Sequence, residues 1–166
     1  IRELPVFYFP YIDFPIDDRR KSGFLVPNYI HSRQNGSEIS LPIYWNIAPQ
    51  YDWLITPKHI SKRGNQIKNL WRYLQPAGSG KITFNYLPND HLFQNWQRNA
   101  ANEYGRTATT TPYLNQLNSE SDNRYFFQWE DQHQWGRWHS ALTINRTSDA
   151  YYFQDLNHQA AFASDT

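Results

Sequence analysis

The sequence contains no cysteine and no methionine among its 166 residues. Without cysteine the chain can form neither a disulfide framework nor a thiolate metal site. No apolar run approaches the roughly 18 residues that a membrane-spanning helix needs. The charges nearly cancel, with a formal net charge of +1, so no overall field draws the chain to nucleic acid. The lack of methionine, with Ile1 as the first residue, indicates an internal stretch of a longer chain.

Aromatic residues are abundant where these other types are missing. They make up 17% of the chain, with 7 Trp, 12 Tyr and 10 Phe. Aromatic and β-branched side chains favour strands, and a polar sequence rich in them suits sheets with one wet face. The composition therefore predicts an all-β protein.

The clearest strand pattern runs from Ser40 to Ile60 and contains two prolines. Apolar residues occupy the odd positions around Pro42, and polar residues occupy most of the even ones, which is the period of a strand with one apolar face. A similar alternation surrounds Pro57. We expect the two strands to form a hairpin. Proline cannot donate to a ladder of hydrogen bonds, so both prolines weaken a strand that is otherwise well defined.

Further strands are predicted at 66–75, 81–87, 124–130 and 137–146, and the segment 24–32 reads as a strand interrupted by Pro27. Together these segments predict an antiparallel meander of roughly six confident strands. Residues 88–123 break the pattern, because they are polar and carry only scattered apolar side chains. We expect a long polar loop there, and no segment shows a convincing helical period.

The N-terminal segment has a different character. Pro5, Pro10 and Pro15 exclude Leu4–Ile16 from the centre of a sheet. The run Asp17, Asp18, Arg19, Arg20 and Lys21, followed by Gly23, is typical of a solvated junction between two bodies. We favour a solvated turn over phosphate binding for these charges, because the aspartates balance the basic residues.

Periodicity leaves two architectures open. In water the apolar face would fold over a core, as in a soluble β-sandwich or barrel that binds glycan or lipid through exposed aromatic residues. In lipid the same face would point outward around a wet lumen. The strand lengths are close to the roughly 9 to 11 residues of a tilted spanning strand, which favours the membrane.

An enzyme is not indicated. Glu130, Asp131, His133 and His139 could surround a metal ion if a hairpin brought them together. Polar residues are expected beside the turn at Gly136, so a solvated turn is the preferred interpretation. No nucleophile elbow, phosphate-binding glycine loop or zinc-helix motif occurs, and we predict no catalytic residue, metal or cofactor.

Several stretches do resemble a known family. They are PVFYFPYIDFPIDDRRKSGFLVPN, LPIYWNIAPQYDWLITPKHISKRG, WRYL, YLPND and WHSALTINRTSDAYYFQDL. In this order they resemble the LptD (OstA or Imp) family of outer-membrane lipopolysaccharide-assembly proteins. The resemblance implies that residues 1–20 end a periplasmic β-jellyroll and form its junction. Residues 21–166 would then be the first strands of a large transmembrane β-barrel.

The resemblance also implies a function. The chain would be part of a translocon that receives lipopolysaccharide from the periplasm and inserts it into the outer leaflet through a lateral gate. Its implied partners are lipopolysaccharide, an LptE-type plug lipoprotein and an LptA-type periplasmic bridge. Its implied location is the Gram-negative outer membrane, with the N-terminal end facing the periplasm.

Named residues follow from this resemblance and from the strand pattern. Pro42 and Pro57 match the prolines of the family's first two strands and are the expected gate. Asp17, Asp18, Arg19, Arg20 and Gly23 are the expected hinge, with lipid passing near Phe7, Tyr8 or Phe14. Tyr44, Asn46 and Thr56 are expected to face the lumen. The residues expected to face lipid are Ile39, Ile43, Trp45, Ile55, Ile82, Phe84, Phe127 and Leu142.

Overall fold

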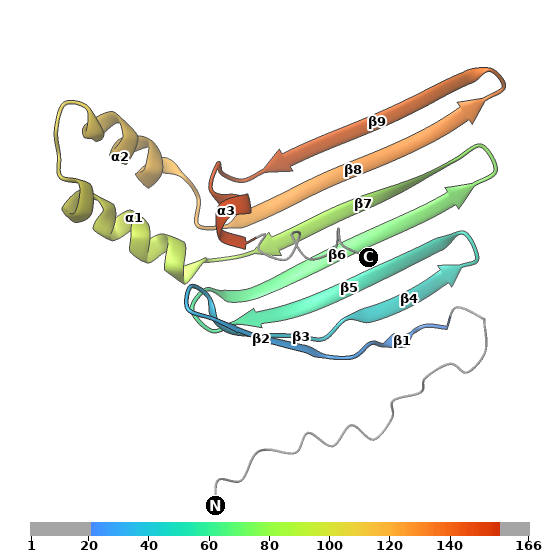
Figure 1. Cartoon of the computed structure of the whole chain (residues 1–166), viewed down its shortest axis with the longest axis horizontal. Helices are drawn as coiled ribbons and strands as arrows, with labels where there is room; N and C mark the ends of the chain where they lie inside the picture. Colours follow the sequence, from blue (N-terminus) through green and yellow to red (C-terminus); the bar gives the residue numbers. More distant parts are fainter. Residues whose placement is uncertain (1–20, 157–166) are drawn as a thin grey trace, which may run out of the picture.

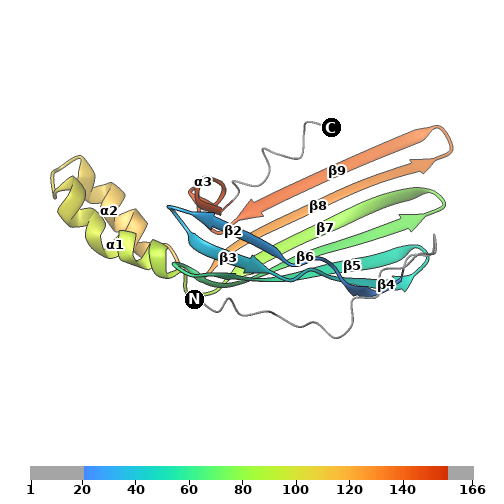
Figure 2. The same ribbon diagram turned by 60° about the horizontal axis from the view of Figure 1, so that its bottom comes forward.

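The computed structural model describes residues 21–156. They form one nine-stranded antiparallel sheet, and a pair of helices extends beyond one end of it (Figures 1 and 2). The main strand order is β1-β4-β5-β6-β7-β8-β9, with β2 and β3 beside this path. The strands are β1 (Gly23–Phe24), β2 (Asn28–Ser32), β3 (Gly36–Ser40), β4 (Ile43–Ala48), β5 (Tyr51–Ile60), β6 (Gly64–Gln75), β7 (Gly78–Leu87), β8 (Arg124–Trp135) and β9 (Trp138–Thr147). The helices are α1 (His91–Tyr104), α2 (Thr110–Ser119) and α3 (Tyr152–Leu156).

Strands β3 and β4 are two parts of one strand that is interrupted at Pro42. Both pair with β5, through Ser40 opposite Lys58 and Ile43 opposite Ile55. Two residues lie between the paired positions on each side, so the register continues through the break. The predicted hairpin is therefore confirmed, and a bulge between Asn46 and Ala48 precedes its turn. Strands β1 and β2 form a similarly interrupted edge, paired with β4 and β3 respectively.

The register gives the sheet an apolar face. Trp45 lies opposite Trp53, which lies opposite Trp71 on the next strand. Neighbouring rings in this row have centroids 6.0 and 5.9 Å apart. The row continues across β7 through Ile82, which lies opposite Trp129. We call the side of the sheet that carries this row the apolar face.

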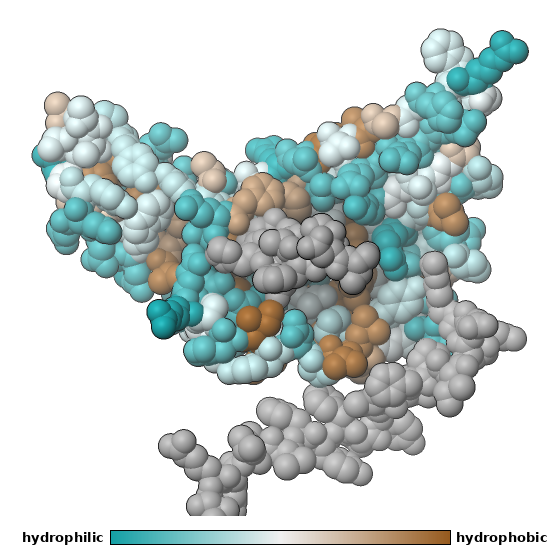
Figure 3. Space-filling view, viewed as in Figure 1, coloured by the Kyte–Doolittle hydropathy of each residue, from teal (hydrophilic) through white to brown (hydrophobic). Residues whose placement is uncertain are grey.

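The opposite side, which we call the polar face, carries charged and amide side chains. Arg72 lies opposite Asp52 and pairs with it at 2.7 Å. Lys81 lies opposite Glu130 and pairs with it at 3.0 Å. Figure 3 views the molecule from the side on which α3 lies, where hydrophilic teal residues predominate among isolated brown ones. The alternation seen in the sequence thus corresponds to a real division between the two faces.

Residues 88–123 correct one expectation. The strand pattern ends at Leu87 and resumes at Arg124 as predicted, but the segment between them forms α1 and α2. The prediction of a long polar loop in this segment is wrong, because two helices occupy most of it. Both helices enclose a small apolar core, and Asp90 caps α1 by accepting hydrogen bonds from the amides of Leu92 and Phe93. That core consists of Phe93, Ala100, Leu114 and Leu117.

The six confident strands are all present, and β6, β7 and β8 are longer than predicted. Strand β8 continues to Trp135, beyond the predicted end at residue 130. Strand β3 begins at Gly36, whose φ of 77° is in the left-handed region that favours glycine. A Cβ at this position would lie 2.2 Å from the Ser61 hydroxyl oxygen. The short helix α3 was not predicted.

The expected division at residue 20 stays a prediction, because residues 1–20 lie outside the described part of the chain. The same holds for the proline-rich segment Leu4–Ile16. Within residues 21–156, none of the helices has the length and apolar character needed to cross a membrane.

Candidate functional site in the sheet and its rim

The two prolines lie beside different seams of the sheet, where a seam is the line of backbone contacts between two neighbouring strands. The amide of Leu25, beyond the end of β1, donates to the Pro42 carbonyl at 2.8 Å. In an extended strand the amide and carbonyl of one residue point to the same side. The position of the missing amide at Pro42 therefore faces the edge strand β1.

Pro57 faces the other way. Its carbonyl accepts a hydrogen bond of 3.1 Å from the amide of Leu41. The missing amide of Pro57 consequently faces the seam between β5 and the β3–β4 strand. A non-proline residue there would complete the pair of bonds with Leu41. The two prolines thus remove one donor from each of two adjacent seams, not two donors from one seam.

The outermost seam is the weaker of the two. Strand β1 pairs with β4 only through Gly23 and Phe24. The next residues, Leu25 and Val26, are exposed apolar side chains, and Val26 is 68% exposed. The edge strand is therefore bound to β4 by few ladder hydrogen bonds. Pro42 lies next to this short pairing and offers it no further donor.

The residues expected to face the lumen share the polar face. Tyr44 lies opposite Leu54, and Asn46 lies opposite Asp52. Thr56 lies on the same side of β5, two residues beyond Leu54. The Tyr44 hydroxyl donates to Asp52 Oδ2 at 3.2 Å. These three residues occupy a surface of hydrogen-bonding and charged groups.

The residues expected to face lipid share the apolar face. The register connects them strand by strand from Ile39 on β3 to Leu142 on β9. Trp45 is 50% exposed although it is a large apolar side chain. Ile39, Phe84 and Leu142 are exposed as well. Nothing among residues 21–156 covers this row with a second sheet. The proposed environment of each residue stays a prediction, while their common face is a structural fact.

A buried charge network, here called the rim network, lies at the helical end of the sheet. Asp90 accepts hydrogen bonds from Arg63 at 2.6 Å and from Arg124 at 3.1 Å. Arg124 also binds both carboxylate oxygens of Asp149 and donates to Asp155 at 2.8 Å. Arg63 and Arg124 are almost completely buried. Buried ion pairs of this kind are stable only when the remaining hydrogen-bonding groups are satisfied.

The rim network continues to the edge of the sheet. Arg63 Nε donates to Asn35 Oδ1 at 2.8 Å, and Asn35 donates to Glu38 at 2.9 Å. Glu38 in turn pairs with Lys58 on β5. The chain connections before β3, before β6, before α1, before β8 and after β9 are therefore joined by consecutive polar contacts. Within residues 21–156, the opposite rim has the short turns between β4 and β5, between β6 and β7, and between β8 and β9.

One acidic group beside the rim network has an altered pKa. Burial raises the pKa of Glu120 above its ordinary value, and Asp149 acts in the same direction. Its Oε2 is the one buried side-chain polar atom without a hydrogen-bond partner within residues 21–156. Glu120 is thus a carboxyl group with a raised pKa and one unpaired oxygen, beside a network whose other buried polar groups have hydrogen-bond partners.

The residues considered for a metal do not converge. Asp131 binds His133 Nδ1 at 2.8 Å on the apolar face, and it also accepts a hydrogen bond from Tyr73. Glu130 lies on the opposite face of β8, and His139 lies on the next strand facing the same way as Glu130. Between residues 21 and 156, no group of three or more His, Cys, Asp or Glu could hold a metal ion.

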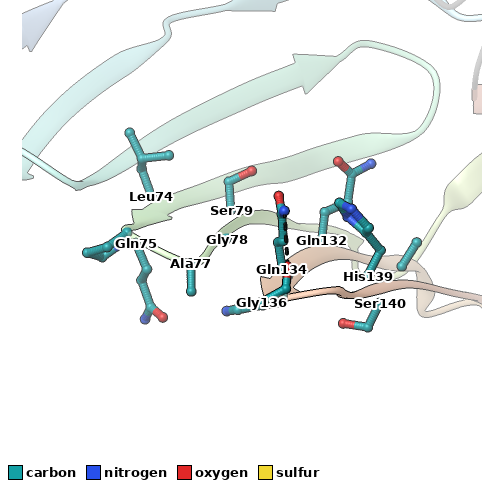
Figure 4. Close-up of a pocket in the computed structure, with 13 residues that line it drawn as sticks. Leu74, Gln75, Ala77, Gly78, Ser79, Gln132, Gln134, Gly136, His139 and Ser140 are labelled. Atoms are coloured by element: carbon teal, nitrogen blue, oxygen red, sulfur yellow. Dashed lines mark hydrogen bonds between the residues drawn. The ribbon is translucent and has the colours of Figure 1, made fainter.

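An open pocket lies at the hairpin ends of β6–β7 and β8–β9 (Figure 4). Its volume is about 790 Å³, and glycine, alanine, serine and glutamine provide much of its lining. His133 and His139 are its only titratable lining residues in the described chain. In Figure 4 the labelled lining residues are spread along the two turns and do not converge on one point. This pocket suggests no reaction.

The expected hinge is described only at its last residue. Gly23 begins β1 and pairs with Tyr44, while Asp17, Asp18, Arg19 and Arg20 lie outside the described residues, as do Phe7, Tyr8 and Phe14. Sequence reasoning missed the rim network altogether. One signal was available, since Asp90 precedes a run with apolar residues at helical spacing, which is typical of an N-cap.

Comparisons with known proteins give the same family name in each case. A profile of the family described as "LptD: LPS transport system D" matches residues 122–166. An "LPS-assembly protein LptD" of Coxiella burnetii (strain RSA 493 / Nine Mile phase I) is 38% identical over 170 residues, covering 99% of this chain and 20% of that protein. Proteins of the same name from Yersinia enterocolitica and Shewanella sp. (strain MR-4) are 36% and 37% identical, covering 99% of this chain and 19% of their own length. This chain spans about a fifth of the length of these relatives.

Proposed function

Because this chain belongs to the LptD family, we propose that it forms part of the outer-membrane translocon that assembles lipopolysaccharide. In this proposal the translocon receives lipopolysaccharide from the periplasm and releases it into the outer leaflet through a lateral gate. The described sheet contributes the first part of the barrel wall. No chemical step is assigned to it.

The division of the sheet into two faces is the observation that carries this proposal. On the apolar face, Trp45, Phe84 and Leu142 are exposed apolar side chains. On the polar face, Asp52 and Lys58 are buried and paired with charges. A soluble sandwich would need a second layer over the apolar face, and residues 21–156 supply none. A wall between lipid and a wet lumen needs no such layer.

The position of each proline supports a gate at the edge of this wall. A lipid with a large polar head can leave a barrel sideways only if ladder bonds at one seam are broken, and these are costly to lose in hydrocarbon. Pro42 removes a donor from the outermost seam, which is already short of bonds. Pro57 removes a donor from the next seam, between β5 and the β3–β4 strand. The strand that carries Pro42 is therefore held less firmly on its other side as well. We therefore assign the opening itself to Pro42 and a supporting role to Pro57.

The proposed partners and orientation follow the family. The polar face would enclose the lumen and meet a plug lipoprotein of the LptE type. The N-terminal end would face the periplasm, where the jellyroll and an LptA-type bridge deliver lipopolysaccharide. The segment with Phe7, Tyr8 and Phe14 would pass the lipid, and the charged run with Asp17 and Arg20 would keep the hinge solvated.

Cysteine labelling of the complete protein in cells tests the membrane arrangement. Single cysteines at Ile43, Ile82 and Phe127 are expected to react with a lipid-soluble maleimide. Cysteines at Asn46 and Thr56 are expected to react with a small water-soluble maleimide. Preferential aqueous labelling of the first group would overturn the proposal.

Transport itself is tested with the variants Pro42→Ala and Pro57→Ala. The double variant is expected to assemble normally and to deliver lipopolysaccharide to the surface more slowly, with Pro42→Ala accounting for most of the effect. Surface lipopolysaccharide is measured by pulse labelling, and barrel assembly by heat-modifiable migration. An unaltered rate in a fully assembled double variant would mean that the prolines only bend the strands.

Photo-crosslinking tests the entry path separately. A photoreactive amino acid at Phe7, Tyr8 or Phe14 is expected to capture lipopolysaccharide in cells. Empty crosslinks at all three positions, with positive controls elsewhere in the jellyroll, would reject this path without affecting the proposal for the sheet.

A further inference from the structure

A second pocket lies at the helical end of the sheet. It has a volume of about 640 Å³ and is lined by residues of α1, α2 and α3 and of three connecting segments. This volume falls within the range of pockets that bind small ligands. Because the pocket is built mainly by the inserted helices, the strand pattern of the wall does not account for its side chains.

Aromatic rings form much of the pocket. Trp96 meets Tyr151 edge to face, with ring centroids 5.0 Å apart. Tyr104 meets Tyr113 in the same manner at 6.4 Å. These contacts hold the rings in fixed orientations, and Tyr104 remains 50% exposed. Exposed and oriented aromatic faces are suited to the C–H surfaces of sugar rings, which are apolar and flat.

Polar groups stand beside the rings. Asn95 and Asn99 are exposed side chains of α1, four residues apart and therefore on the same side of the helix. Both line the pocket, and each amide can donate and accept at once. The Tyr151 hydroxyl donates to the Tyr113 hydroxyl at 2.8 Å. That bond, more than burial, raises the pKa of Tyr151 to about 12, and it leaves the hydrogen of Tyr113 able to point to a ligand.

The charges of the pocket exclude some ligands. Glu103 and Asp155 line it as acids, and Arg63 is the only lysine or arginine among the described lining residues. Arg63 is buried and already bound to Asp90 and Asn35. No available cation therefore receives a phosphate or a sugar acid. Asp155 is already paired with Arg124, and the exposed Glu103 carboxylate repels an anion. Amides and aromatic faces remain, which match hydroxyl and N-acetyl groups.

From these observations we propose that this pocket binds a neutral oligosaccharide, with pyranose rings stacked on Trp96 and Tyr104 and hydroxyl groups bound by Asn95 and Asn99. The proposal does not depend on transport through the sheet, since it requires only the folded helical rim. The sugar can come from a surface glycan of the same cell or from outside, and the chemistry of recognition is the same.

Binding is tested on the complete protein, purified in lauryldimethylamine oxide so that no sugar-based detergent competes. The probes are maltotriose, chitotriose and the anionic trisaccharide of galacturonic acid. Saturation-transfer NMR is expected to show contact with at least one neutral probe and none with the anionic probe. Tyr104→Ala and Asn99→Ala are each expected to weaken that binding about tenfold, which corresponds to the loss of one good contact.

Trp138→Ala is the matched control, because Trp138 is an exposed aromatic residue at the opposite rim, with 78% exposure. It is expected to leave binding unchanged. Heat-modifiable migration establishes that each variant is folded, and both test positions are exposed side chains whose removal leaves the helix core intact. A lack of transfer to both neutral probes, a preference for the anionic probe, or equal binding by all folded variants would overturn the proposal.

Discussion

Single residues decide how strongly neighbouring strands hold each other in this sheet. Pro42 and Pro57 lie on adjacent strands, yet their missing amides face different seams, because their carbonyls accept from Leu25 and Leu41 respectively. The sequence revealed both prolines and their strands. It could not reveal the direction of each missing donor, since that depends on which neighbour a residue faces.

Replacing Pro57 with alanine is expected to strengthen the seam with β4 without much change in global stability. The new amide can donate to the Leu41 carbonyl, a gain of about 0.5–1.5 kcal/mol. The greater freedom of the unfolded chain offsets about 0.4–1 kcal/mol of that gain. Hydrogen exchange of the Leu41 amide should therefore slow roughly twofold to tenfold. Pro76→Ala, in a turn at the opposite rim, should leave this amide unaffected, and equal slowing in both variants would contradict the assignment.

Glu120 is expected to make stability depend on pH. Its pKa in the folded protein is raised above the ordinary 4.5 by burial and by Asp149, with Arg124 opposing the shift. The folded state therefore holds a proton that the unfolded state has already lost, and stability falls as the pH rises above 4.5. Glu120→Gln should remove this decline.

Melting temperatures of the complete protein, recorded from acid to neutral pH, measure the effect. Glu103→Gln, an exposed glutamate of α1, serves as the control and should keep the decline of the unaltered protein. A parallel decline in Glu120→Gln would exclude Glu120 as its source.

Among the elements, the strands were predictable and the helices were not. Period-two alternation identified β4 through β9 because each strand meets different surroundings on its two sides. Residues 88–123 lack that alternation and were assigned to a loop, although Phe93, Trp96 and Ala100 follow a helical spacing. The many Asn, Thr and Ser residues there hid the signal. The pairing of α1 with α2 depends on only four buried side chains, so little of it was visible in the sequence.

Asp90 is expected to be the most sensitive residue at the start of α1. Asp90→Asn keeps an oxygen for the cap but removes the charge that Arg63 and Arg124 share. Leaving buried arginines without that partner costs about 3–5 kcal/mol. Asp90→Ala should cost about 0.5–2 kcal/mol more, because the amides of Leu92 and Phe93 also lose their acceptor. Hydrogen exchange at these two amides separates the effects, since only the alanine variant should expose them. Equal exchange in both variants would show that the cap contributes nothing.

At the scale of the whole molecule, the two rims of the described sheet differ. The rim network holds the connections together at the helical end, and short hairpin turns close the strands at the other end. The rim network joins connections that are far apart in the sequence, from Asn35 to Asp155. No local pattern predicts such contacts, because each partner looks like an ordinary surface charge until the fold buries it. If the sheet opens at its edge as proposed, the rim network is expected to keep the other strands in register.

The two faces of the wall lead to the final prediction, which uses neighbouring positions on β7. Ile82 lies on the apolar face between Trp71 and Trp129, and Thr83 lies on the polar face between Leu70 and Gln128. In a bilayer, arginine at Ile82 must be placed in hydrocarbon, at a cost of about 2–4 kcal/mol near the midplane. Arginine at Thr83 would extend into a hydrated lumen beside Glu130 and should cost much less.

Urea unfolding of the complete protein in phosphatidylcholine vesicles compares Ile82→Arg with Thr83→Arg at the same strand depth and the same added charge. If Ile82 were instead covered by protein in a soluble fold, Ile82→Arg would lower the free energy of unfolding by the same amount in detergent and in vesicles. The membrane arrangement instead predicts a penalty that decreases as the bilayer is made thinner, because the guanidinium then reaches the interface more easily. An Ile82→Arg penalty that is independent of bilayer thickness, or no larger than that of Thr83→Arg, would place the apolar face somewhere other than in lipid.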